Sequence, residues 1–456
     1  MKKIFNLTAI VLVCIMFSSC QKEFLEKKPD KALLIPTTLE DFNALMDNLA
    51  VFNTSPALQE ISADDYYAND AGVAGFTTTI QKNSYLWAAD IYQSQPCADW
   101  NLPYQQVFYS NIILDGLKPL EAAEGPTSGW KTAKGSALFH REFAFYNLVQ
   151  LFAKAYDKNT AGTDLGIPLR LSADVNGKLG RASIQQVYDQ ILTDLIQAEK
   201  LLPQQTAFKN RPSKAAANAL LARVNLTMEN YEQANRYAAT SLSHNNTLLD
   251  YNTISQTASN PFPYSPVDDN PEIIFYDKLI SYGFTSSTRT TVADELYQQY
   301  ADKDLRKSIF FAGIAPFYVK GRYTGFRLQL FGGLSVDELY LIQAECLART
   351  AKQAEAMNAL NMLLVTRWTK GSFQPMTAAN AEDALDIILR ERRKELAFRG
   401  LRWGDLKRLN KDPRFAKTVT RTVSGQTYTL APNSKRYVLP IPVEEVSASG
   451  IPQNER

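Results

Sequence analysis

The sequence holds few of the side chains that most catalytic and metal sites require. Its 456 residues include only two histidines, His140 and His244, and four cysteines. Neither histidine stands in a known catalytic motif, and the HExxH, GxSxG and Walker-type patterns are absent. We therefore expect both histidines to be structural, and we expect neither an enzyme nor a bound cofactor.

Long apolar runs are also missing, with one short exception near the N-terminus. Two lysines precede the run Ala9–Phe17, which is too short to cross a bilayer, and small residues then lead into Cys20. This order resembles the bacterial lipoprotein signal, in which the cysteine is acylated, for example with palmitate. An ordinary secretory signal with an incidental cysteine is the alternative. We expect a signal peptide over residues 1–19, lipidation of Cys20 and a polar tether over residues 20–36.

Cysteine usage argues against a disulfide framework. Cys14 lies within the expected signal peptide, so Cys97 and Cys346 are the thiols left to the folded part, and no CxxC pair occurs. Cys346 lies in an apolar helical run and is expected to be buried and inert. A bridge between Cys97 and Cys346 stays open at this stage.

The mature chain has no excess of charge of either sign. Loss of the two leader lysines leaves 47 basic and 47 acidic side chains. Binding to nucleic acid depends on neutralising many phosphates. We therefore expect no nucleic-acid partner.

Apolar residues recur at helical spacing through most of the chain. This spacing predicts helices over Thr38–Asn48, Tyr104–Leu117 and Ala133–Ala155. Ser183 and Gln186 form a predicted capping box in front of a further helix. The sequence therefore predicts a mainly α fold.

Two segments, Ser213–Ser243 and Ser335–Arg367, are predicted to be helical hairpins that resemble tetratricopeptide repeats. Each has a pair of alanines twelve residues apart across its turn, which would let the two helices approach closely. The pairs are Ala222 with Ala234 and Ala344 with Ala356. The second hairpin also opens on a predicted capping box, Ser335 with Glu338. Between the hairpins, residues 245–333 carry several prolines and predict irregular structure with short strands.

The stretch Ala384–Arg408 is the most distinctive part of the sequence. Its first half predicts an amphipathic helix that Gly400 would end, since glycine adopts a left-handed conformation without steric cost. ERRKELAF, then RG, RW and DLKR, resembles the C-terminal signature of the SusD/RagB-like family, with departures at Arg399 and Gly404. We expect Asp405 and the arginines of this stretch to be structural rather than ligand-binding.

That resemblance implies a single SusD-like α-helical domain over residues 37–456, with tetratricopeptide-like hairpins near 213–243 and 335–367 and an irregular insert at 245–333. The family consists of nutrient-binding lipoproteins in the outer membrane of Bacteroidota. The resemblance implies an anchored protein that faces the cell exterior. It would bind an oligosaccharide and deliver it to a SusC-like TonB-dependent transporter.

Aromatic residues in expected loops are the candidate ligand contacts. A sugar ring stacks its C–H face on an aromatic face, and its hydroxyl groups bond polar side chains. On this reasoning we select Tyr67, Trp87, Tyr282, Tyr318 and Arg322 as ligand-binding residues.

Other interpretations remain open at the level of sequence. A surface glycoside hydrolase, a scaffold that binds only protein, and a lipoprotein that captures peptides or other nutrients fit the same composition. Asp157, Asn159 and Asp164 line one expected loop and could bind calcium, although the EF-hand pattern is absent and we predict no metal site.

Overall fold

The computed structural model describes residues 36–263, 270–286 and 288–456. Leu39–Arg456 forms one compact unit in which helices dominate, as predicted. Cys20, the expected signal peptide and nearly all of the expected tether lie outside the described residues. Within the described residues, no helix combines the length and the apolarity that a membrane span requires.

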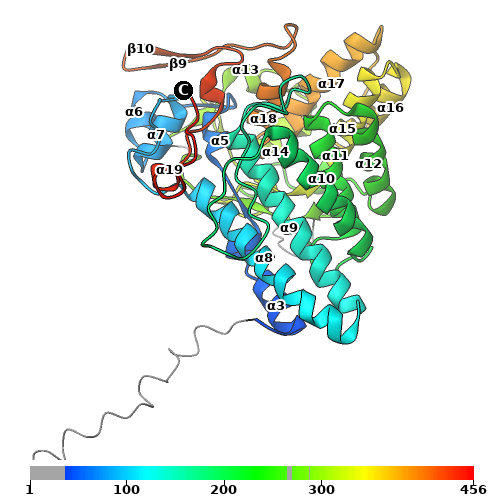
Figure 1. Cartoon of the computed structure of the whole chain (residues 1–456). Coiled ribbons are helices and arrows are strands. Elements are labelled where there is room, and N and C mark those ends of the chain that lie inside the picture. The colour runs from blue at the N-terminus through cyan, green and yellow to red at the C-terminus, as the bar shows by residue number, and fades with distance from the viewer. Residues whose placement is uncertain (1–35, 264–269, 287) are drawn as a thin grey trace, which may run out of the picture. The chain divides into compact units, whose positions relative to one another are not determined.

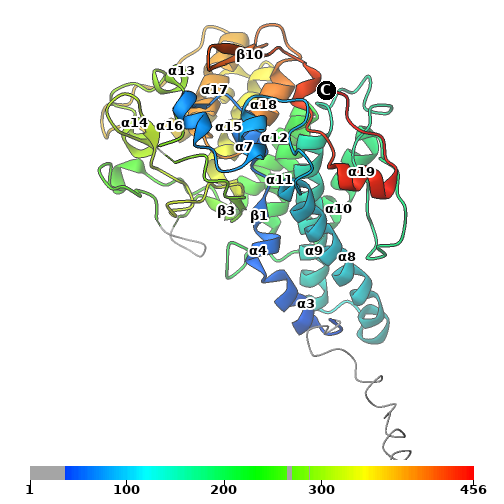
Figure 2. The same ribbon diagram turned by 90° about the vertical axis from the view of Figure 1, so that its left-hand side faces the viewer.

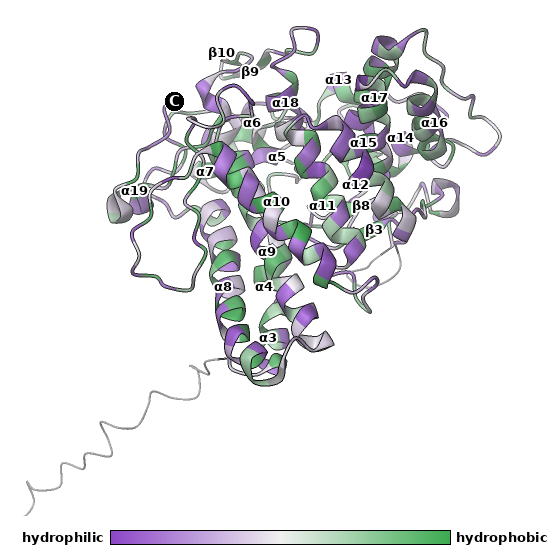
Figure 3. Cartoon of the chain, turned by 45° about the vertical axis from the view of Figure 1, so that its right-hand side comes forward, coloured by the Kyte–Doolittle hydropathy of each residue, from purple (hydrophilic) through white to green (hydrophobic). Residues whose placement is uncertain are grey.

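The long helices lie side by side as a series in which each packs against the next (Figure 1). The series runs α8 (Ala98–Glu124), α9 (Ser128–Phe152), α10 (Ile184–Leu201), α11 (Lys214–Thr227), α12 (Tyr231–His244), α15 (Val336–Arg349) and α16 (Gln353–Leu364). The visible helices carry both hydrophilic and hydrophobic residues (Figure 3), as amphipathic packing requires. Short N-terminal helices complete this half: α3 (Leu39–Met46), α4 (Leu49–Phe52), α5 (Leu58–Ser62), α6 (Asp70–Ala74) and α7 (Thr79–Tyr85).

The predicted capping box at α10 is present. The Ser183 hydroxyl accepts from the Gln186 backbone N–H, and the Gln186 side chain accepts from the Ser183 N–H. Both predicted hairpins are also present, as α11–α12 and α15–α16. Their four spaced alanines are fully buried, which confirms the close helix approach: Ala222, Ala234, Ala344 and Ala356.

The second predicted capping box, at Ser335, is wrong. The Ser335 hydroxyl donates to Asp337 Oδ1 instead of accepting from the backbone. The Glu338 carboxylate does not reach back to Ser335 because it forms a buried bidentate pair with Arg223, with contacts of 2.8 and 2.6 Å. A tertiary ion pair therefore replaces the local cap.

The insert between the hairpins is irregular with short strands, as predicted (Figure 2). The strand pairs are β1 (Thr54–Ser55) with β4 (Lys278–Leu279), β2 (Tyr66–Tyr67) with β5 (Thr291–Val292), β3 (Ile273–Phe275) with β8 (Leu334–Ser335), and β6 (Phe311–Ala312) with β7 (Tyr318–Val319). All pairs but the first are antiparallel. The insert also holds η1 (Tyr251–Thr253), α13 (Asp294–Tyr297) and α14 (Leu305–Phe310), and its β2–β5 pair joins it to the N-terminal part.

The distinctive C-terminal stretch forms α17 (Ala381–Glu395) and α18 (Arg402–Leu409). The helix ends at Glu395, so the prediction that Gly400 ends it is wrong. The chain turns earlier because Phe398 is already left-handed, with φ of 66°, and its ring packs on Tyr66. Gly400 is left-handed too, at 72°, but it shapes the connection to α18. The chain closes with β9 (Val419–Val423), β10 (Gln426–Leu430), η2 (Lys435–Tyr437) and α19 (Val443–Ser449).

Buried ion pairs hold this stretch in place. Arg306 on α14 and Arg367 after α16 share the carboxylate of Glu395, at 2.9 and 2.7 Å. Arg367 also pairs with Glu272 at 2.7 Å. The expected structural role of Asp405 is confirmed, since it pairs with Arg392 on α17. These side chains are all buried, so their charges are stabilised by one another rather than by water.

Loss of a shared cation should be costly. Arg367→Met should lower the free energy of unfolding by about 3–5 kcal/mol, because Glu272 and Glu395 would stay buried without it. Urea unfolding followed by circular dichroism measures the change. Arg211→Met is the control, since its pair with Asp47 is partly exposed and should be worth less than about 1 kcal/mol. Equal losses in the two variants would contradict this assignment.

Burial of His140 gives a clear pH prediction. Its ring packs against Phe52 at 4.8 Å and against Phe275 at 5.7 Å, and burial lowers its pKa to about 3. Between pH 3 and the ordinary histidine pKa of about 6.5, the folded chain binds fewer protons than the unfolded chain, so His140 makes stability fall on acidification. His140→Phe should remove about 1.5 kcal/mol of the loss between pH 6.5 and 5.

Urea unfolding at both pH values tests this difference. His244→Gln serves as the control, because His244 is only half-buried at the end of α12. If His140→Phe and wild type lose equal stability between the two pH values, His140 is not the source of the acid sensitivity.

Candidate ligand-binding site

Two of the five predicted ligand contacts, Tyr67 and Tyr318, are exposed. Their exposed fractions are 48% and 36%. Tyr67 in β2 pairs with Thr291 in β5, and the next residue, Val292, donates its N–H to Phe317 O, just before Tyr318. Tyr67 and Tyr318 lie about 250 residues apart in sequence. The structure places them on neighbouring segments, which are separated by roughly the spacing of adjacent strands.

Trp87, by contrast, lies in the core with 1% of its surface exposed. Its indole N–H donates to Ser62 O at 3.0 Å, and its ring centroid lies 4.3 Å from the Arg421 guanidinium. Arg421 also lies 3.8 Å from the ring of Tyr85. A cation between two rings is a stable buried arrangement. We therefore correct the prediction and assign Trp87 a structural role.

Tyr282 and Arg322 are also structural. The Tyr282 hydroxyl donates to Asp99, whose other oxygen accepts from the first N–H groups of the α5 turn, and burial together with Asp99 raises the pKa of Tyr282. Arg322 is 7% exposed and donates to the carbonyls of Val319 and Thr285. The Tyr282 hydroxyl and the two terminal nitrogens of Arg322 therefore hold loops together.

The exposed Tyr67 stands in a pocket of 520 Å³, which we call the Tyr67 groove. It lies between β2, β5, α13 and the start of β9, so three distant parts of the chain build it. Its accessible lining is rich in hydroxyl, amide and charged groups. These residues are Asn69, Thr288, Arg289, Thr291, Asp294, Glu295, Lys417, Thr418 and Thr420.

Arginine and lysine fix two of the carboxylates in the Tyr67 groove. Burial would raise the pKa of Asp64, but Arg402 at 2.6 Å and Arg393 at 3.1 Å outweigh it and hold that pKa well below its usual range. Burial is likewise outweighed at Glu295, where Lys417 and Arg393 lower the pKa. Both groups therefore stay ionised at neutral pH.

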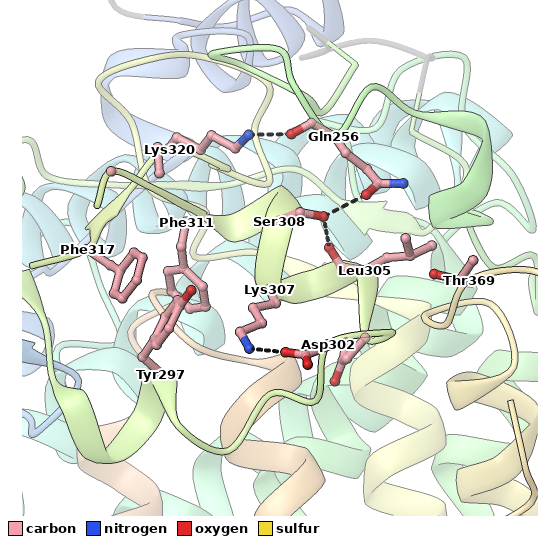
Figure 4. A pocket seen from close by; sticks show the side chains of 13 residues that line it. Gln256, Tyr297, Asp302, Leu305, Lys307, Ser308, Phe311, Phe317, Lys320 and Thr369 are labelled. Carbon is pink, nitrogen blue, oxygen red and sulfur yellow. Dashed lines mark hydrogen bonds and ion pairs between the residues drawn. The ribbon is translucent and has the colours of Figure 1, made fainter. Parts of the chain in front are cut away.

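A second pocket has a volume of 410 Å³ and is called the Lys320 pocket here (Figure 4). Tyr297 and Phe317 form one side of it, stacked with ring centroids 3.7 Å apart. Lys320 Nζ donates to Gln256 O at 2.5 Å, and Ser308 donates to the Gln256 side chain at 2.9 Å. Sequence reasoning missed Tyr297 and Lys320, because nothing local to either marks it as part of a pocket.

Neither the calcium nor the disulfide hypothesis gains a structural basis. Lys154 at 2.5 Å and Thr160 at 2.7 Å already occupy the Asp164 carboxylate. Within the described residues, no cluster of three or more histidine, cysteine, aspartate or glutamate side chains is arranged to hold a metal. Cys97 and Cys346 are both buried and free, so they form no bridge.

Comparison with known proteins decides the family. A family model described as "Starch-binding associating with outer membrane" matches residues 23–226, and the SusD family model matches residues 337–455. The chain belongs to the SusD/RagB-like family. The description of the first model ties the family to starch binding and to the outer membrane.

Relatives of this SusD-family chain are distant in sequence and close in fold. SusD-like protein P2 from Formosa agariphila is 25% identical over 335 residues, which cover 60% of this chain and 64%, less than two thirds, of that protein. A putative sugar binding protein from Bacteroides vulgatus has a TM-score of 0.73 at 22% identity, covering 92% of this chain and 99% of its own. A SusD superfamily protein from Bacteroides thetaiotaomicron has a TM-score of 0.72 at 22% identity, with coverage of 92% and 100%.

Stability measurements should separate the buried tryptophan from the exposed tyrosine. Trp87→Ala should cost about 3–5 kcal/mol, because it empties a core position and leaves Arg421 without one of its rings. Tyr67→Ala should change the free energy of unfolding by no more than about 0.5 kcal/mol, since the ring is exposed. Urea unfolding of both variants tests this, and similar costs at the two positions would show that the assignment of one of them is wrong.

Proposed function

We propose that this protein is a surface lipoprotein of the outer membrane that binds an oligosaccharide and delivers it to a SusC-like TonB-dependent transporter. The Tyr67 groove is the observation that carries the proposal, because it combines an exposed aromatic ring with closely set polar groups. Membership of the SusD/RagB-like family supports the same conclusion.

The groove has the groups that bind a sugar without reacting with it. The Tyr67 ring offers a face for the apolar C–H side of a pyranose. Asn69, Asp294 and Thr291 supply donors and acceptors for ring hydroxyl groups. Because Asp64 and Glu295 are held in ion pairs, the floor of the groove keeps its shape when a ligand enters.

Glycoside hydrolysis suits the groove less well. A glycosidase needs a general acid, usually a carboxyl whose pKa is raised so that it carries a proton near neutral pH. In two of the three carboxylates that line the groove, Asp64 and Glu295, neighbouring arginine and lysine lower the pKa instead. We therefore favour capture and transfer over cleavage.

Attachment and delivery complete the proposal. Acylation of Cys20 would hold the protein at the membrane, and the tether after it would give the domain reach. The tetratricopeptide-like hairpins would contact the transporter. Met362 and Val365 at α16 are 55% and 53% exposed, so this hairpin offers apolar side chains to a partner.

Calorimetry on residues 21–456 with a panel of plant, host and microbial glycans tests ligand capture. We expect saturable binding with the sugar unchanged, and a loss of affinity of about tenfold in Tyr67→Ala, from the removed stacking. Phe208→Ala is the control, because Phe208 is equally exposed, at 49%, and lies outside the groove.

Product analysis of the same mixtures gives the opposing outcomes. Shortened saccharides would show an enzyme and overturn the capture proposal. Equal loss of affinity in Tyr67→Ala and Phe208→Ala would remove the groove as the site while leaving saccharide binding in place.

A further inference from the structure

Lys320 differs from the other charged side chains of its pocket because no opposite charge in the described part of the chain neutralises it. Lys307 pairs with Asp302 at 2.8 Å, and Asp304 is buried against Arg306 at 2.7 Å. Lys320 has no such partner: its ammonium donates to a neutral backbone carbonyl, that of Gln256. Among the described residues, no carboxylate lies within ion-pair distance of Lys320.

The pKa of Lys320 agrees with the absence of an acidic partner. Burial lowers the pKa of Lys320, and no nearby acid offsets that effect. At Lys307 the opposite holds, because the hydrogen bond to Asp302 raises the pKa of the lysine. Burial weakens the hydration of an ammonium group. An anion from solution compensates for that loss where no carboxylate of the protein does so, and a partly buried ammonium of this kind therefore attracts anions.

The other groups of the pocket match the rest of a sugar. Tyr297 and Phe317 form an apolar wall, and Gln256 and Ser308 provide polar groups near the lysine (Figure 4). An aromatic wall, a hydroxyl, an amide and one uncompensated cation together suit a sugar ring that carries an acidic substituent.

We propose that the Lys320 pocket binds the carboxylate or sulfate group of an acidic saccharide. The inference rests on the proposed function and adds the class of ligand. The two pockets use neighbouring residues of the same segments: Glu295 and Pro316 line the Tyr67 groove, while Tyr297 and Phe317, one or two residues further on, line the Lys320 pocket. On this proposal, one oligosaccharide would place a sugar on Tyr67 and an acidic unit at Lys320.

Matched pairs of saccharides test the proposal by calorimetry. Galacturonate oligosaccharides are compared with their methyl esters, and sulfated galactan oligosaccharides with desulfated ones, so that each pair shares its sugar backbone and one member lacks the charge. We expect the acidic member of at least one pair to bind about tenfold more tightly, as one charge-assisted contact allows. The pair that shows the preference identifies carboxylate or sulfate as the group.

Three variants assign the preference to one side chain. Lys320→Met should abolish it and leave the neutral sugar unaffected, whereas Lys320→Arg should keep most of it. Lys303→Met is the matched control, because Lys303 is exposed, lies outside the pocket and changes the net charge equally. It should preserve the preference.

The outcomes separate this inference from the proposed function. Binding of neutral and acidic saccharides with equal affinity, or equal effects of Lys320→Met and Lys303→Met, overturns the Lys320 assignment and leaves saccharide capture standing. Failure of every saccharide to bind overturns the proposed function, and the inference with it.

Discussion

Glu395 accepts from two buried arginines, and the arrangement of the whole C-terminal half depends on that contact. Arg306 comes from the insert and Arg367 from the end of the second hairpin, and each reaches one oxygen of Glu395. The three side chains are fully buried. Loss of either arginine would leave one oxygen of the buried Glu395 carboxylate without its cation, so insert, hairpin and α17 are coupled through this residue.

Both pockets are built outward from these buried charges. On α14, Arg306 points into the core, while the next two residues, Lys307 and Ser308, line the Lys320 pocket. On α17, Arg392 pairs with Asp405 inside, and its neighbour Arg393 reaches Asp64 and Glu295 beneath the Tyr67 groove. The site is therefore held by helices and not by its own short strands, whose few backbone hydrogen bonds could not fix it.

The sequence was informative wherever a local pattern decides the structure. The Ser183–Gln186 box, the alanine pairs and the irregular insert all depend on residues close together in the chain, and all are present. The failures have a common cause. At Ser335 and at the end of α17, partners far away in sequence, Arg223 and Tyr66, replaced the expected local geometry. Local propensity gives way when a tertiary contact is worth more.

The candidate site was harder to predict because burial of an aromatic residue depends on distant cations. Trp87 has the sequence context of a loop residue. In the structure its ring is buried against the guanidinium of Arg421, which lies more than 300 residues later in the sequence. The guanidinium of Arg399 likewise lies 3.7 Å from the ring centroid of Tyr323, and that of Arg367 lies 4.1 Å from the ring centroid of Tyr251.

Many arginines of this fold thus serve its aromatic core, in addition to its carboxylates. An aromatic residue that meets such an arginine contributes to stability, whereas Tyr67 remains at the surface with its ring exposed. Whether an aromatic ring lies in the core or is free to bind a ligand depends on its contacts with arginines far away in the sequence. Aromatic content alone could therefore indicate that a sugar site exists, but not which rings form it.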